Sequence, residues 1–188
     1  GTTAGQSDAA WGAFVSLQQV QSGYDANGRK TSDAMTASGT TYSLTQYTYD
    51  SLGRPDCTIQ RMNPAVYGIV LPICSLGTQG SDGPDRLVKA SYDDASRLVG
   101  TTSGYGTADA GSDGALTFTA NGKAQTYTDG EGHLTTMEYD GFDRLVKTRY
   151  PNSSGSGSST TDYEQLSYDS RSNVTQRRLR DGQSIGFA

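Results

Sequence analysis

The six residues Tyr24-Asp25-Ala26-Asn27-Gly28-Arg29 recur as Tyr49-Asp50-Ser51-Leu52-Gly53-Arg54, and this repeated box decides the fold. Internal repetition with a period of roughly 20 to 50 residues is typical of repeat architectures, in which each unit stacks on its neighbours. Looser copies follow at Tyr92-Asp93-Asp94-Ala95-Ser96-Arg97, Tyr139-Asp140-Gly141-Phe142-Asp143-Arg144 and Tyr168-Asp169-Ser170-Arg171-Ser172-Asn173. Two degenerate copies are Phe118-Thr119-Ala120-Asn121-Gly122-Lys123 and Thr128-Asp129-Gly130-Glu131-Gly132-His133.

The box predicts a tight turn between two strands. An Asp at the first turn position can accept a hydrogen bond from the backbone two residues on, and the Gly three positions later can take the left-handed conformation. Flanking residues alternate as strand residues do, for example over 42–49 and 145–150. The sequence therefore predicts an all-β fold of antiparallel hairpin repeats. In the Gly position, Ser96, Asp143 and Ser172 predict looser or differently shaped turns, because a left-handed non-Gly residue costs about 1 kcal/mol.

The composition supports short strands and a thin core. Only 33% of the 188 residues are hydrophobic, while the chain holds 24 Gly and 12 Tyr. A net charge of -5 and a pI near 4.7 argue against nucleic-acid binding, which needs an excess of Lys and Arg. No apolar run is long enough to span a membrane, so no membrane span is expected.

The boxes resemble the YD repeat of the RHS (rearrangement hot spot) proteins, which include bacterial polymorphic toxins, the C component of insecticidal toxin complexes, and teneurins. The resemblance covers roughly residues 15–188 and rests on five clear copies. It implies a curved, spiralling sheet, a part of the RHS shell that encloses a C-terminal toxin in the bacterial members. It also implies secretion or display on a bacterial surface. No aspartyl self-cleavage signature of that family is present, and the segment 185–188 looks like a strand leading into a further box.

Residues 1–188 are therefore expected to be one segment of a longer array. Within it, Gly and Pro predict an irregular insertion at 57–84, and a Ser/Gly-rich stretch predicts a flexible loop at 151–160. Near the start, residues 9–17 fit a helix with Ala10, Trp11, Phe14 and Leu17 on one face, but Gly12 favours a strand over 14–21.

The cysteines and the histidine limit the chemistry. Cys57 and Cys74 flank the insertion and are expected to form a disulfide in an oxidising compartment, the alternative being two separate buried thiols. A Ser-His-Asp or Cys-His device would have to use His133, the only histidine, which falls where the clear boxes have Arg and is interpreted as a drifted repeat position. Too few ligands exist for a zinc site of cysteines and histidines. We expect no enzyme and no cofactor.

Three weaker motifs each have a bland explanation beside a functional one. Asp25 to Gly28 and Asp129 to Gly132, with Asp33 and Glu138 nearby, resemble fragments of calcium loops, but the EF-hand spacing is absent and a turn explains the same residues. The sequons at Asn152 and Asn173 arise easily in a Ser/Thr-rich chain. Exposed tyrosines beside Arg and Asp suit a sugar-binding face, although tyrosine also suits a half-solvated sheet.

The leading hypothesis is a non-enzymatic shell segment whose partners are neighbouring repeats or further copies of itself. The alternative is a carbohydrate-binding or adhesion module. Open edges at 15–21 and 183–188 predict pairing with other copies into an oligomer or fibre. The expected repeat-motif residues are structural: Tyr24, Asp25, Gly28, Arg29, Tyr49, Asp50, Gly53, Arg54, Tyr92, Asp93, Arg97, Tyr139, Asp140, Arg144, Tyr168 and Asp169.

Overall fold

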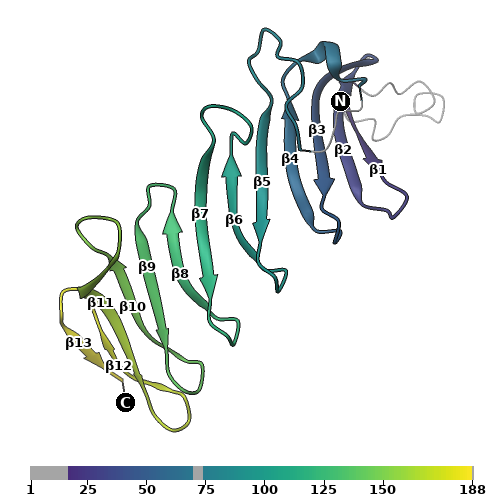
Figure 1. Ribbon diagram of the computed structural model, residues 1–188. Coiled ribbons are helices and arrows are strands. Elements are labelled where there is room, and N and C mark those ends of the chain that lie inside the picture. Colours follow the sequence, from purple (N-terminus) through teal and green to yellow (C-terminus); the bar gives the residue numbers. More distant parts are fainter. Residues whose placement is uncertain (1–16, 70–73, 188) are drawn as a thin grey trace, which may run out of the picture. The chain divides into compact units, whose positions relative to one another are not determined.

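The computed structural model describes residues 17–69 and 74–187, which form thirteen antiparallel strands and one short 3-10 helix (Figure 1). The prediction of an all-β fold of antiparallel hairpins is confirmed. The strands are β1 (Gln19–Tyr24), β2 (Lys30–Ala37), β3 (Thr40–Tyr49), β4 (Pro55–Arg61), β5 (Arg86–Tyr92), β6 (Leu98–Ser103), β7 (Gly111–Phe118), β8 (Ala124–Asp129), β9 (Leu134–Tyr139), β10 (Leu145–Pro151), β11 (Ser158–Tyr168), β12 (Val174–Arg178) and β13 (Ser184–Gly186), and the 3-10 helix is η1 (Pro64–Val66).

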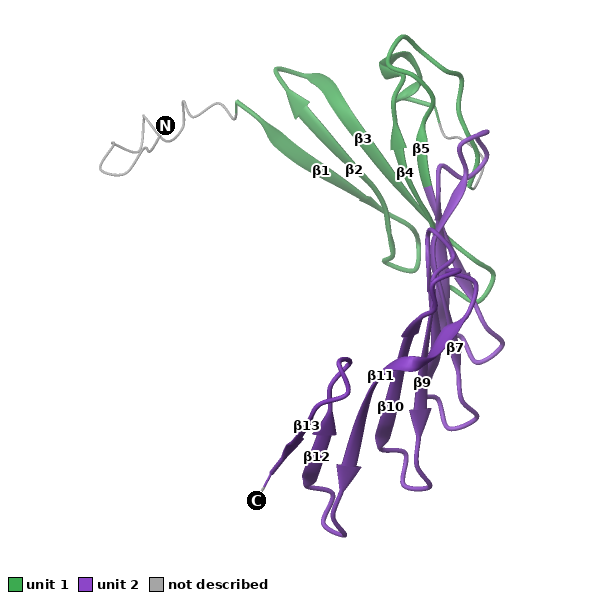
Figure 2. Cartoon of the chain, turned by 90° about the vertical axis from the view of Figure 1, so that its left-hand side faces the viewer, with its two compact units in different colours: residues 1–87 green, residues 88–188 purple. Residues whose placement is uncertain are grey.

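The chain divides into two compact units, residues 1–87 and 88–188 (Figure 2). In the first, β1 pairs with β2, β2 with β3, and β3 with β4. In the second, each strand from β6 to β12 pairs with the strand that follows it along the chain. This up-and-down order places alternate turns at opposite ends of the strands within each unit. Among the described helices, none is long and apolar enough to cross a membrane.

The predicted turns are confirmed, and those without Gly have the same shape as those with it. Ser96, Asp143 and Ser172 have φ of 62°, 60° and 67°, close to the 77° and 80° of Gly28 and Gly53. In each, the backbone N–H of this residue donates to the carbonyl of the box Asp, at 2.9 to 3.1 Å. The expectation of looser turns was therefore wrong. The Asp side chain holds the turn strongly enough to offset the cost of a left-handed Ser or Asp.

Two predicted boundaries also need correction. The insertion does not begin at Cys57, because β4 continues to Arg61 with Cys57, Ile59 and Arg61 buried at alternate positions. The Ser/Gly-rich loop ends before Ser158, where β11 begins. The strand expected over 14–21 is described only from residue 17, and β1 begins at Gln19; the helical alternative lies mostly outside the described residues.

All buried side chains of the described residues belong to the first unit. Cys57, Ile59 and Leu87 form a small core there, with Cys74 and Leu76 packed against it. Described side chains of the second unit are half-buried or exposed. The second unit therefore depends on contacts between neighbouring strands and turns more than on an interior.

Candidate functional site

Each clear box places its Tyr at the last position of a strand. Tyr24, Tyr49, Tyr92, Tyr139 and Tyr168 end β1, β3, β5, β9 and β11, and the next strand begins directly after the box. All box turns of one unit therefore lie at the same end of its strands. We call the Tyr, Asp and Arg side chains of these boxes, with Phe118, the box ladder.

The Asp carboxylate organises each turn. In the second box, Asp50 Oδ1 accepts hydrogen bonds from the backbone N–H of Leu52 and of Arg54, both at 2.9 Å. Asp50 Oδ2 accepts a hydrogen bond from Arg54 Nε at 2.7 Å. The same three bonds recur in the boxes of Asp25, Asp93 and Asp140. Sequence reasoning had anticipated the backbone bond but not the ion pair that fixes Arg.

The fixed Arg then contacts an aromatic ring in the next box turn. The guanidinium carbon of Arg29 lies 4.5 Å from the Tyr49 ring centroid, and that of Arg97 lies 4.3 Å from the Phe118 centroid. Arg144 lies over Tyr168 at 4.6 Å and also donates to the Asp169 carbonyl at 3.0 Å. Cation–π contacts of this kind link successive turns.

The box Tyr hydroxyls complete the link in the opposite direction. Tyr49 Oη donates to the carbonyl of Lys30, Tyr139 Oη to that of Ala124, and Tyr168 Oη to that of Leu145, at 2.8 to 2.9 Å. Each acceptor is the residue directly after the Arg position of the preceding box at the same end of the strands. Tyr24, in the first box, is 61% exposed.

These hydrogen bonds lower the pKa values of the Asp carboxyls in the boxes. The pKa of the Asp25 carboxyl lies below its ordinary value because the backbone N–H of Arg29 donates to it, with the Arg29 side chain adding to the effect. The pKa of Asp140 is lowered chiefly by the hydrogen bond from the Arg144 side chain. These carboxylates are therefore ionised acceptors with their partners in place, a poor starting point for acid–base catalysis near neutral pH.

The degenerate boxes differ in position and in partners. The turn 119–122 keeps the geometry and joins the box ladder, whereas the turn 129–132 lies at the opposite end of the strands. There His133 replaces Arg: its Nδ1 lies 3.0 Å from Asp129 Oδ2. In the last clear box, Asn173 takes the Arg position and donates to Asp169 Oδ2 at 2.9 Å, so this sequon amide is engaged in the turn.

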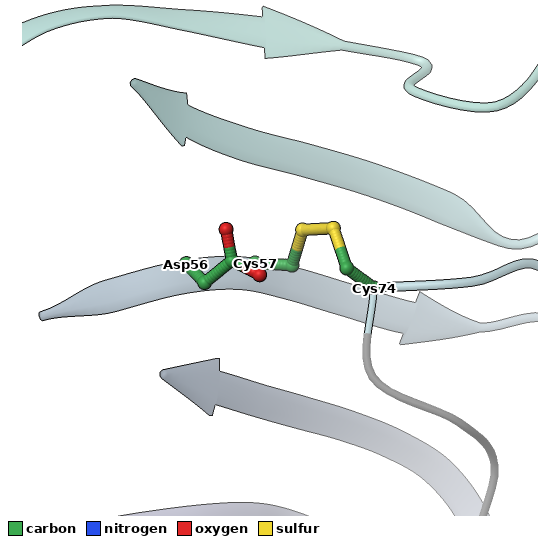
Figure 3. Close-up of side chains that lie close together, drawn as sticks. All are labelled: Asp56, Cys57 and Cys74. Carbon is green, nitrogen blue, oxygen red and sulfur yellow. A yellow bond between two sulfur atoms is a disulfide. The ribbon is translucent and has the colours of Figure 1, made fainter. Parts of the chain in front are cut away.

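The carboxylates proposed as calcium ligands are bonded to other partners in the structure. Asp25 and Asp129 accept the turn bonds described above, Asp33 accepts from Ser22, Lys30 and Tyr47, and Glu138 pairs with Arg149. Within the described residues, one group of potential metal ligands is close enough to be considered: Asp56, Cys57 and Cys74 (Figure 3). The two sulfurs are joined to each other there, with the Cα atoms 5.5 Å apart, and so are not thiolate ligands.

A buried ion pair fastens the irregular connection between β4 and β5. Arg61 and Asp85 side chains are each 1% exposed, and Arg61 Nη1 donates to Asp85 Oδ2 at 2.7 Å. Asp85 also accepts from the backbone N–H of Met62 and Gly77, and Arg61 donates to Gln46 and to the Ser75 carbonyl. Sequence reasoning missed this pair. Its only signal is the alternation that puts Arg61 on the buried face of β4 after Cys57 and Ile59.

Residues 118–154 match the family model of the RHS Repeat. Similar solved structures include TcdB2-TccC3-Cdc42 (TM-score 0.44, 15% identity), TcdB2-TccC3 without the hypervariable C-terminal region (0.43, 17%) and the Photorhabdus luminescens Tc holotoxin pore (0.43, 15%). Each match covers 86% of this chain and 10% of the other, so the chain spans about a tenth of their length. No curated protein sequence matches.

Proposed function

We propose that this chain, residues 118–154 of which match an RHS repeat, is a non-enzymatic structural segment that supplies β-sheet to the wall of a larger shell. The parent protein would be a secreted or surface protein of bacteria, and its shell would enclose or present a C-terminal toxin or effector. One observation carries the proposal: in the box ladder the Asp carboxylate and the Arg side chain bond to each other within one turn, and the Arg and Tyr side chains contact the neighbouring turn. Side chains with these contacts connect neighbouring repeats, and few of their polar groups are left to act on a substrate.

Two further features support a role in the wall of a shell. The described side chains of the second unit are nowhere fully buried, so both faces of its sheet meet solvent or another surface. A disulfide between Cys57 and Cys74 suits an oxidising compartment outside the cytosol. The partners would be the neighbouring repeats of the parent chain.

Limited proteolysis of the full polypeptide that contains this chain tests the enclosure. We expect its C-terminal segment to resist protease while the array is folded and to be cut once denaturant opens the array. Equal cleavage of that segment inside the polypeptide and as a separate protein would contradict enclosure. Hydrolysis of ester, glycoside and phosphodiester substrates, compared between the chain and its His133→Ala variant, tests the absence of catalysis.

Carbohydrate binding is a second candidate function, favoured by the exposure of tyrosine rings. Tyr24, Tyr42 and Tyr127 are 61%, 62% and 41% exposed. An aromatic ring with an apolar face and a polar tip suits a ligand that is itself apolar on one side and hydroxylated at its edge. A glycan array probed with the labelled chain separates this function from a purely structural one.

A further inference from the structure

A small cavity lies on one face of the second unit, over β6, β7 and β8. Its volume is about 180 Å³, and its lining includes Thr101, Asp113, Gly114, Leu116 and Tyr127. Thr101 lies opposite Gly114 in the β6–β7 pairing, and Leu116 lies opposite Tyr127 in the β7–β8 pairing. Residues directly opposite each other share a face of the sheet, so these side chains converge on one side.

Gly114 makes room for the Tyr127 ring. A Cβ atom on Gly114 would lie 3.0 Å from Tyr127 Cε2 and 3.1 Å from Tyr127 Oη, and the backbone there has φ of +154°. The Cε2 and hydroxyl edge of the ring therefore lies close to the Gly114 backbone, while 41% of Tyr127 remains exposed. A ring held in this way loses little conformational freedom when a ligand stacks on it.

Asp113 supplies the polar side of the cavity. The pairing of Thr101 with Gly114 and of Thr102 with Ser112 leaves Asp113 as the extra residue of a bulge, a feature that redirects side chains. Asp113 Oδ2 accepts hydrogen bonds from Thr101 Oγ1 at 2.8 Å and Ser103 Oγ at 2.9 Å. Among the described residues, none donates to Asp113 Oδ1 or bonds to the Tyr127 hydroxyl.

We propose that this cavity binds a neutral hexopyranose, an inference that rests on the second candidate function. The apolar face of the sugar stacks on Tyr127, and its hydroxyls donate to Asp113 Oδ1 and bond to Tyr127 Oη. The cavity is smaller than the roughly 300–1,000 Å³ of pockets that enclose drug-sized ligands, which suits one sugar ring covered on one side.

Other ligand classes fit less well. A hard cation prefers several clustered oxygen ligands, and Asp113 is the only carboxylate in the lining. A purely apolar ring would stack on Tyr127 but would take water from the carboxylate without replacing its hydrogen bonds. A pyranose satisfies both sides of the cavity.

Titration of the isotopically labelled chain with methyl glucoside, methyl galactoside and methyl mannoside, followed by amide NMR shifts, tests the proposal. We expect at least one of these sugars to shift the amides of Gly114, Leu116 and Tyr127. The variants Tyr127→Ala and Asp113→Asn should weaken that binding by about tenfold or more. Phe142→Ala, which removes a more exposed aromatic ring from the 140–143 turn of the same unit, should leave the affinity unchanged.

The possible outcomes distinguish failure of the proposed sugar site from failure of carbohydrate binding as a function. An unchanged sugar affinity in Tyr127→Ala, or amide shifts confined to other residues, would overturn the assignment of this cavity as the sugar site. Carbohydrate binding elsewhere on the chain would still stand. A blank glycan array together with no shift for any of the three sugars would overturn both. Amide spectra of the free variants establish that they are folded, and Tyr127→Phe, which keeps the ring, should retain binding within about threefold.

Discussion

The guanidinium carbon of Arg144 lies 4.6 Å from the ring centroid of Tyr168, so each residue is held by the turn of a different repeat. Arg144 is fixed from its own side by Asp140, and Tyr168 reaches back to the Leu145 carbonyl. This reciprocal contact explains how a sheet with few buried side chains can keep its repeats in register. Its strength is a property of pairs, which makes it measurable by paired substitutions.

Substitution of Asp85 by Asn should destabilise the first unit by roughly 3–5 kcal/mol, because it leaves the buried Arg61 charge without its counter-ion. Urea unfolding measures the change. Asp82→Asn, at an exposed position in the same connection, is the control and should lie within about 0.5 kcal/mol of the wild type. An equal, small effect for both variants would show that the ion pair does not hold the connection.

The same pair predicts a pH dependence. Burial raises the pKa of Asp85, but the backbone N–H of Met62, the Arg61 side chain and the Gly77 N–H outweigh it, so the net pKa is lowered. A lowered folded-state pKa contributes stability above the unfolded value near pH 4, and this contribution is lost as the pH falls through the folded value. We expect the gap in unfolding free energy between wild type and Asp85→Asn to narrow below about pH 4. A constant gap would exclude Asp85 as the titrating group.

Gly28→Ala should cost about 1 kcal/mol through backbone strain alone. Gly28 has φ of +77°, and a Cβ there would meet nothing within 4 Å. Gly141→Ala is the matched control: it lies in a box turn, has no atom within 4 Å of the added Cβ and lacks a positive φ. Thermal unfolding of both variants tests the assignment, which equal stabilities would refute.

The predicted disulfide should contribute roughly 3 kcal/mol by closing a loop between residues 17 apart in sequence. Thiol titration under denaturing, non-reducing conditions should find no free sulfhydryl. Two titratable thiols would reject the bridge. Reduction should then lower the urea midpoint of the wild type but not that of a Cys57→Ser, Cys74→Ser double variant.

Much of this arrangement could be predicted from the sequence because the box acts locally. Asp50 and Gly53 are three residues apart, so the turn that they form can be predicted without knowledge of distant contacts. Arg61 and Asp85, by contrast, are separated by an irregular connection with no periodicity, and no local sequence pattern predicts that they pair. The shape of the Ser96 and Asp143 turns did not follow from the sequence, since the preference for Gly at a left-handed position does not include the side-chain bonds of the box Asp that stabilise these turns.

Self-association through open strand edges is expected for the isolated chain. Among the described strands, β13 pairs only with β12, all three of its residues are exposed, and none is charged. Light scattering should give a mass above the 19.9 kDa of one chain that rises with concentration, and Ile185→Lys should lower it. A concentration-independent mass of one chain would refute the prediction.

A double-mutant cycle between Arg144 and Tyr168 tests the central claim, that neighbouring repeats are joined by the box ladder, most directly. Unfolding free energies are measured for the wild type, Arg144→Ala, Tyr168→Ala and the double variant, with an Arg144 and Tyr127 cycle as the control. We expect a coupling of roughly 0.5–2 kcal/mol for Arg144 and Tyr168 and none for the control. Additive effects of the substitutions in both cycles would contradict a link between neighbouring repeats through the box ladder.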